Sequence, residues 1–205
     1  MSIVNKLVTI AENEQKVYEA GYKGFLNDYQ NNGNRTYYEY AFAGRGWGDA
    51  RYNPKHPITA TSCANYMFTD NYNITSTKVP IIVDTSQSIG VFYYCIKLKT
   101  IPSIKVTDKV VFTSWFTSCS NLEEIYFTED SVIGNSINLS PCTKLTLNSL
   151  KNIINVLKDF SGTDKEFTCK LTLSSESKAI LEAEGATAPN GSTWLEYVES
   201  KCWNV

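Results

Sequence analysis

The residues able to carry nucleophilic or metal chemistry are a single histidine and six cysteines. His56 lies in a proline-containing stretch, Pro54-Lys-His-Pro57, and the cysteines form no Cys-x-x-Cys pair. A Ser or Cys nucleophile needs a base held beside it, and zinc needs several ligands at close spacing. The chain also lacks a Gly-x-Ser-x-Gly motif. We therefore predict no zinc site, no cofactor and no Ser or Cys hydrolase.

A carboxylate pair for glycoside cleavage is the catalytic arrangement that the sequence leaves open. The available acids are Asp70, Asp84, Glu123, Glu124, Glu129 and Asp130. We expect the Glu123-Glu124 and Glu129-Asp130 pairs to lie on the solvent side of the fold, where charge only keeps a surface hydrated. The sequence thus favours a protein that is not an enzyme, with a polysaccharide-acting hydrolase using surface carboxylates as the alternative.

Three of the cysteines belong to a recurring sequence motif. It consists of an aromatic or aliphatic residue, two residues of any type, Cys, two further residues of any type, and Leu. Its copies begin at Phe92, Phe116 and Leu139, and they place Cys95, Cys119 and Cys142 at a nearly constant spacing (119 − 95 = 24, 142 − 119 = 23). A fixed period in the twenties is typical of stacked repeats that bury their apolar sides against one another. We predict that these cysteines are buried free thiols, stacked one above another, and that Cys63, Cys169 and Cys202 are core residues.

The middle copy, Leu122-Glu-Glu-Ile125-Tyr-Phe127, has the L-x-x-L-x-L spacing of a leucine-rich repeat. It resembles the short irregular repeats of BspA-like bacterial surface antigens. In the first copy Pro102 follows Ile101, so we expect a short or edge strand there. The third copy is reduced to Leu145-Thr-Leu147 before a helix.

Elements of other types flank the repeats. Residues 3–29 have an amphipathic pattern that predicts a helix, packed either on its own domain or against copies of itself. Residues 37–42 alternate as a strand, within an aromatic stretch to Phe68 that forms a small core or, with Arg45, grips a sugar. We expect a strand at 79–83, with residues 89–92 leading into the first repeat. Beyond the repeats we expect a helix over 149–160, a strand over 167–173, a helix from 175 to about 184, and a last helix opened by a Thr193–Glu196 capping box.

The predicted fold class is therefore α/β: a short irregular leucine-rich-repeat solenoid with an N-terminal helix, a β-rich module and a C-terminal helix-strand-helix cap. We assign residues 1–30 to the helix, a possible oligomerisation arm, and 31–78 to an aromatic-rich β/loop module. Residues 79–147 are the repeats, and residues 148–205 are the cap.

Two flanking stretches add a second resemblance. The opening, including Asn32-Gly-Asn-Arg-Thr36 and Tyr40-Ala-Phe-Ala-Gly-Arg-Gly-Trp47, and the tail from Leu147 to Val205 are similar to leucine-rich-repeat proteins of phages and prophages of gut Firmicutes. That resemblance implies a tail-associated or surface protein of the virion, made in the bacterial cytoplasm and released by lysis. The implied partners are other virion proteins and a host cell-surface glycan or protein, in a homo-oligomer, most simply a trimer.

Charge and hydropathy restrict the partners further. Lys and Arg total 19 against 21 Asp and Glu, without a basic cluster, so nucleic acid is not an expected ligand. The sequence contains no apolar run long enough for a membrane span and no secretory signal pattern at its start. We expect the outward side chains of the repeats and of the aromatic stretch to bind the ligand: Lys97, Lys99, Glu123, Glu124, Tyr126, Lys144, Arg45 and Trp47.

Overall fold

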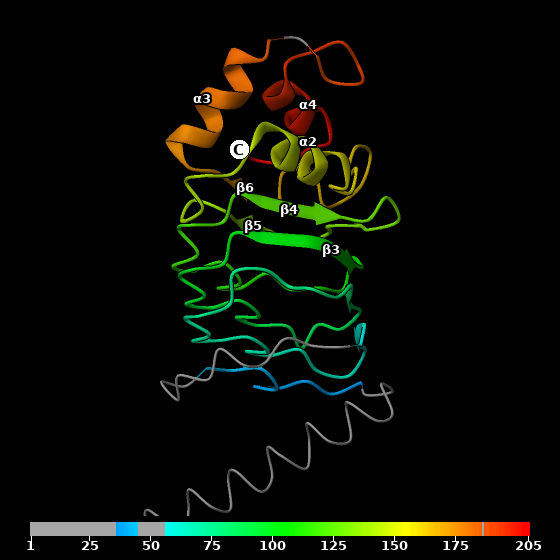
Figure 1. Cartoon of the computed structure of the whole chain (residues 1–205). Helices are drawn as coiled ribbons and strands as arrows, with labels where there is room; N and C mark the ends of the chain where they lie inside the picture. Colours follow the sequence, from blue (N-terminus) through cyan, green and yellow to red (C-terminus); the bar gives the residue numbers. More distant parts are fainter. Residues whose placement is uncertain (1–35, 45–55, 186) are drawn as a thin grey trace, which may run out of the picture.

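A parallel four-stranded sheet runs through the chain, of which the computed structural model describes residues 36–44, 56–185 and 187–205. Its strands are β1 (Ile58–Ala60), β2 (Ile81–Val83), β3 (Thr100–Val106) and β4 (Glu124–Phe127), adjacent in chain order. A second parallel pair joins β5 (Ile137–Asn138) to β6 (Leu171–Thr172). Figure 1 shows three helices of the described residues gathered at the C-terminal end, beyond β4. The predicted α/β class is confirmed.

Paired residues of neighbouring strands are separated in the sequence by nearly the same interval as the repeated cysteines. Ile58 pairs with Ile81, Ile81 with Ile104, and Ile104 with Phe127, so each step advances the chain by the same interval (81 − 58 = 104 − 81 = 127 − 104 = 23). These four side chains are at most 2% exposed. Because every parallel step keeps the same face inward, one apolar column forms along the sheet.

The prediction for the strand that contains Pro102 is wrong. β3 has 7 residues and lies between β2 and β4, so it is neither short nor at an edge. Its pairing with β4 shifts register between Ile101 and Ile104, and Pro102 lies in that interval with an exposed side chain. A bulge is one place where a sheet interior accepts a residue without a backbone N–H.

Aromatic rings form a second column in the core. The ring centroids of Phe42 and Phe68 are 5.0 Å apart, those of Phe68 and Phe92 5.2 Å, and those of Phe92 and Phe116 6.1 Å, all nearly parallel. Rings at these spacings pack favourably beyond the area they bury. The column begins at Phe42, so the repeated arrangement extends well before the first copy recognised in the sequence.

The cysteines accompany this ring column. Cys95 Sγ donates to Phe68 O and Cys119 Sγ to Phe92 O, both at 3.1 Å. All six cysteines are free and buried, which confirms the predicted burial of Cys95, Cys119 and Cys142 and of the other three. One position earlier in the column, Asn71 Nδ2 donates to Phe42 O at 3.2 Å, in the same role as the thiols.

The segments assigned to separate regions share one core. β1 lies in the predicted 31–78 module and pairs with β2 of the 79–147 repeats, and the buried apolar residues form a single cluster from Tyr38 to Trp203. Sheet and core thus continue across residue 78 in the described part of the chain. The predicted helix over residues 3–29 lies outside the described residues.

Helix α2 (Leu147–Asn155) covers the edge of β4 where a further strand would pair. Asn152 Oδ1 accepts from Phe127 N at 2.7 Å, and Asn152 Nδ2 donates to Phe127 O at 2.9 Å. One turn earlier on the helix, Ser149 Oγ accepts from Ile125 N at 3.0 Å. Two side chains on one face of the helix thus replace the hydrogen bonds of a neighbouring strand, which closes an otherwise open sheet edge.

The C-terminal helices follow their local capping signals. α3 (Ser175–Ala183) begins after Ser174, whose hydroxyl accepts from Ser177 N, and α4 (Trp194–Ser200) begins after the predicted Thr193–Glu196 capping box. The 149–160 helix was predicted wrongly at both ends. α2 starts after Thr146, which accepts from Ser149 N, and it ends at Asn155, although Leu157 and Phe160 remain buried.

Three predicted strands are wrong or shortened. β6 covers only Leu171 and Thr172 of the predicted 167–173 strand, and Phe167 is 52% exposed at a positive φ of 55°. β2 covers only Ile81–Val83 of the predicted 79–83 strand. The predicted 37–42 strand is wrong, because residues 39–42 form a turn, preceded by a single bridge between Tyr37 and Cys63.

A buried lysine ties α4 to α2. Lys201 Nζ donates to the carbonyls of Ile154, Asn155 and Leu157 at 2.9, 3.0 and 3.1 Å, while its residue is only 7% exposed. The last carbonyls of a helix lack intrahelical partners, and an ammonium group satisfies them and the helix dipole together. Burial lowers the pKa of Lys201 from its usual value.

Candidate binding surface

Five tyrosines and an aspartate gather on the segments that connect the strands. We call this set the tyrosine face: Tyr40, Tyr66, Asp70, Tyr72, Tyr93 and Tyr94. Backbone bonds hold the segments side by side, since Tyr40 N donates to Asn65 O, Tyr66 N to Ile89 O and Asp70 N to Tyr93 O at 3.1, 2.7 and 2.9 Å. The face therefore belongs to three neighbouring segments of one rigid stack.

The side chains of the tyrosine face contact one another in three pairs. The rings of Tyr40 and Tyr66 stack with centroids 5.2 Å apart, and Tyr66 lies over Gly90, where an added Cβ would come within 2.7 Å of its ring. The rings of Tyr93 and Tyr94 meet at 4.6 Å and 57°. Tyr72 donates its hydroxyl hydrogen to Asp70 Oδ1 at 3.3 Å.

The backbone under this surface is unusual and periodic. Tyr40, Tyr66, Gly90 and Ser114 have φ of 51°, 53°, 61° and 58°, and they recur at nearly the spacing of the repeats (66 − 40 = 26, 90 − 66 = 24, 114 − 90 = 24). Asp70, Tyr94 and Ser118 form a second column with φ of 55°, 58° and 63°. A bulky residue with positive φ is uncommon and persists only where its surroundings hold it. Here the hydrogen bonds between segments hold it and direct the side chains outward.

The surroundings of Tyr72 and Tyr93 keep the hydroxyl groups of these two residues protonated to higher pH than usual. The negative charge of Asp70 raises the pKa of Tyr72, and burial, followed by the neighbouring Tyr94, raises the pKa of Tyr93. Tyr72, Tyr94 and Tyr40 are between 37% and 40% exposed. The face thus offers flat apolar rings, protonated hydroxyl groups and one carboxylate, a composition suited to binding with little loss of side-chain entropy.

The lysines expected to bind a ligand have polar partners on neighbouring segments of the stack. Lys97 Nζ donates to Asn73 Oδ1 at 3.4 Å and Lys144 Nζ to Asn121 Oδ1 at 2.7 Å, while Lys99 Nζ is 3.5 Å from Glu123 Oε1. Glu124 and Tyr126 lie on β4 and are partly exposed. Arg45 and Trp47 lie outside the described residues.

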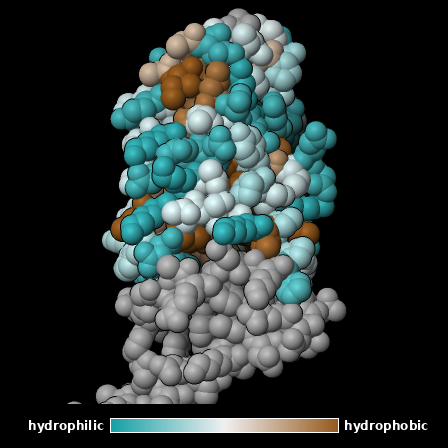
Figure 2. Space-filling model, in the orientation of Figure 1, coloured by the Kyte–Doolittle hydropathy of each residue, from teal (hydrophilic) through white to brown (hydrophobic). Residues whose placement is uncertain are grey.

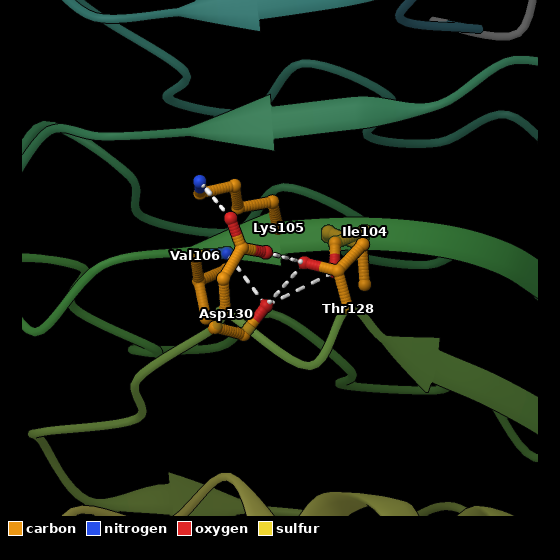
Figure 3. A network of polar contacts seen from close by, with 6 residues as sticks. Ile104, Lys105, Val106, Thr128 and Asp130 are labelled. Atoms are coloured by element: carbon orange, nitrogen blue, oxygen red, sulfur yellow. Dashed lines mark hydrogen bonds and ion pairs between the residues drawn. The ribbon is translucent and has the colours of Figure 1, made fainter.

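Polar contacts between neighbouring segments are a general feature of the surface. Figure 3 shows Lys105 of β3 reaching Asp130, whose carboxylate also accepts from Thr128 Oγ1 at 2.6 Å. Ser131 Oγ completes the network by accepting from Val106 N at 3.3 Å. Such contacts fix the register between segments.

Two of the carboxylates considered for glycoside cleavage, Asp84 and Asp130, have lowered pKa values. A hydrogen bond from Thr107 lowers the pKa of Asp84, and a hydrogen bond from Lys105 lowers the pKa of Asp130. A catalytic general acid needs the opposite shift, so that it stays protonated near neutral pH. Both groups are also engaged by lysines, Lys109 and Lys105 respectively.

The three cysteines of the repeat motif are poorly suited to act as nucleophiles. Burial raises the pKa of Cys119 to about 12 and raises the pKa of Cys95 and Cys142 as well. The reactive form of a cysteine is the thiolate, which is scarce at such pKa values. In the described part of the chain, no three His, Cys, Asp or Glu side chains are placed to share a metal ion.

A cavity of about 450 Å³ lies at the C-terminal end, lined by Phe167, Lys170, Glu199, Trp203, Asn204 and Val205.

The face of the molecule seen in Figure 2 is mostly hydrophilic over the described residues, with a hydrophobic patch near the end that carries α3. None of the helices described is both long and apolar enough to cross a membrane.

Most of the tyrosine face was not predicted from the sequence, although the sequence contains an earlier copy of the repeat motif that indicates it. Phe68-x-x-Asn71-x-x-Ile74 is an earlier copy of the motif that begins at Phe92 (92 − 68 = 24), with Asn71 in the cysteine position. Recognition of that copy would have aligned Tyr66 with Gly90 and Asp70 with Tyr94. No sequence signal announces that these positions have positive φ, because tyrosine is not typical of that conformation.

The chain matches no protein-family model, and searches of the curated proteins and of the solved structures found no significant match either.

Proposed function

We propose that this chain is a non-catalytic recognition protein, built as a short irregular leucine-rich-repeat solenoid, whose tyrosine face binds a glycan on a cell surface. The constant offset between paired strands and the two columns of positive φ support the solenoid reading. A solenoid of this kind is stabilised by contacts between neighbours and displays a fixed row of side chains.

The observation that carries the binding proposal is the tyrosine face itself. Three of its tyrosines, Tyr40, Tyr72 and Tyr94, remain more than a third exposed, and two of them, Tyr40 and Tyr94, lie on backbone with positive φ. Such an arrangement is costly for a surface that binds nothing. Flat rings pack on the apolar faces of sugars, and the hydroxyl groups and Asp70 are available for sugar hydroxyls. This extends the sequence-based suggestion of an aromatic sugar grip from residues 37–68 to the next segment, 90–94.

The biological setting remains the one that the sequence resemblance implies: a virion or tail-associated protein of a phage that recognises its bacterial host. Lys97, Lys99 and Lys144, through their polar partners on neighbouring segments, then hold the segments in place. Self-association through residues 1–30, most simply as a trimer, would multiply a weak individual contact by avidity.

A glycan array and a reducing-sugar assay, run on the same purified chain, test this proposal. We expect array binding that is lost in Tyr72→Ala and kept in Tyr126→Ala, with no release of reducing ends. The two variants remove the same side chain, one from the tyrosine face and one from β4. Steady release of reducing ends, abolished in Asp84→Asn or Asp130→Asn, would instead favour the hydrolase.

A further inference from the structure

We propose that the tyrosine face binds an organic ammonium group of its ligand, with Asp70 as the counter-ion. This inference rests on the proposed function and specifies the ligand class of the same site. It follows from the charge of Asp70, from the rings around it and from the absence of a lysine partner among the described residues.

Asp70 differs from the carboxylates that form ion pairs elsewhere on the stack. Asp84, Asp108 and Glu123 have a lysine Nζ at 3.1, 2.7 and 3.5 Å, and Asp130 and Glu184 are paired with Lys105 and Lys151. For Asp70 the structure records, in the described part of the chain, only the neutral hydroxyl of Tyr72 as a side-chain hydrogen-bond partner. Lys97, on the neighbouring segment, contacts Asn73 instead.

The rings beside Asp70 favour the same kind of ligand. The face of an aromatic ring carries negative potential and attracts a cation within about 6 Å of its centroid. Tyr93 and Tyr94 meet at 57°, so the two rings form a corner, and Tyr72 is held to Asp70 by its hydroxyl. An alkylated ammonium group is weakly hydrated and combines charge with apolar surface. It suits these two inclined rings and Asp70, which lies on the adjacent segment because its N–H donates to Tyr93 O at 2.9 Å.

Two kinds of surface polymer carry such a group. An amino sugar with a free amine presents a primary ammonium, and a choline substituent presents a quaternary ammonium. Both would place a positive charge between Asp70 and the rings. A neutral N-acetylated sugar of the same shape has no charge at this point and is the informative comparison.

Titration calorimetry of the full chain with three probes tests the inference: a glucosamine oligosaccharide, its N-acetylated counterpart and choline chloride. We expect one or both cationic probes to bind at least about tenfold more tightly than the N-acetylated one. Binding of glucosamine alone identifies the primary ammonium, and binding of choline alone the quaternary one. The preference should shrink as salt is raised, because salt screens exposed charge.

Asp70→Asn should remove this preference while leaving the fold intact, because asparagine tolerates the positive φ of position 70. The matched control is Asp164→Asn, the same substitution at an exposed residue outside the tyrosine face. Equal binding of charged and N-acetylated probes, binding of none of them, or an unchanged preference in Asp70→Asn would overturn the inference. Binding of the N-acetylated probe alone, if it depends on the tyrosines, would contradict the ammonium site and still support the proposed function. Absence of any array binding by the unmodified chain would contradict both.

Discussion

At the residue scale, the core is built from identical positions stacked along the molecule. Leu122 is fully buried between the segments that contain Cys95 and Cys142, while its neighbour Glu123 is partly exposed and pairs with Lys99. The sequence alone distinguished these two positions, because the L-x-x-L-x-L spacing fixes which side chains face inward. Their substitution should therefore have very different costs.

Leu122→Ala should lower the free energy of unfolding by about 2–5 kcal/mol, the range for removing a large buried aliphatic side chain. Leu122→Asp should cost more, because it buries a charge without a partner. Glu123→Ala should cost less than about 1 kcal/mol, since exposed ion pairs contribute little. Urea denaturation of the three variants measures these differences. A larger loss for Glu123→Ala than for Leu122→Ala would reverse the inward and outward assignment.

The buried cysteines lead to a second prediction at this scale. Because burial raises the pKa of Cys95, Cys119 and Cys142, their thiolate forms are scarce at neutral pH. A thiol reagent should label the three slowly in the native protein and quickly in denaturant, as followed by mass spectrometry. Rapid labelling of all three in the folded state would contradict the register described above.

At the element scale, the edge of β4 is closed by a helix and not by another strand. Asn152 alone satisfies both the N–H and the carbonyl of Phe127, and Ser149 satisfies the N–H of Ile125. Without those side chains, backbone polar groups would lose their partners at a protected edge.

Asn152→Ala should therefore destabilise the protein by about 1–3 kcal/mol, the cost of leaving a protected polar group unpaired. Asn148→Ala is the matched control, because Asn148 lies on the same helix with an exposed side chain. Its replacement should be neutral or slightly stabilising, since alanine favours helix. Thermal melts of both variants give the comparison, and equal losses would show that α2 does not close the sheet through Asn152.

The elements also show which features the sequence could reveal. Short-range signals worked: Ser174 and the Thr193–Glu196 box start α3 and α4 as predicted. Long-range effects did not: the bulge that admits Pro102 in β3, and the αL backbone of Tyr66, Asp70 and Tyr94, depend on neighbouring segments. The candidate site was missed for the same reason, because its tyrosines meet only when successive segments of the repeat are stacked side by side.

At the scale of the whole molecule, ion pairs and hydrogen bonds between segments make stability depend on acidity. Hydrogen bonds from Thr107, Lys158 and Lys105 lower the pKa of Asp84, Asp108 and Asp130 respectively. A folded-state pKa below the unfolded value of about 3.9 means that the stabilisation is present above that value and is lost as pH falls through the folded pKa.

The melting temperature should therefore fall modestly as the pH drops below about 4, since exposed ion pairs contribute little, and it should change little between about pH 6 and 8. In a variant with Asp84, Asp108 and Asp130 all replaced by Asn, that acid-induced fall should be smaller, because the groups that take up protons are gone. Calorimetric scans at each pH test this. An identical pH profile for the variant would show that these carboxylates do not link the segments.

The central claim is that the tyrosine face is a binding surface. Binding of labelled protein to a panel of intact gut Firmicutes cells, the cells that the sequence resemblance implies as targets, tests it most directly. The variants to compare are the double substitution Tyr72→Ala and Tyr93→Ala, and Tyr126→Ala as the control on β4. We predict that the double variant melts cooperatively like the unmodified chain and loses at least about tenfold in apparent affinity, equivalent to about 1.4 kcal/mol, while Tyr126→Ala retains full binding. Undiminished binding by the folded double variant, with loss in Tyr126→Ala, would contradict the claim and assign recognition to the strand face.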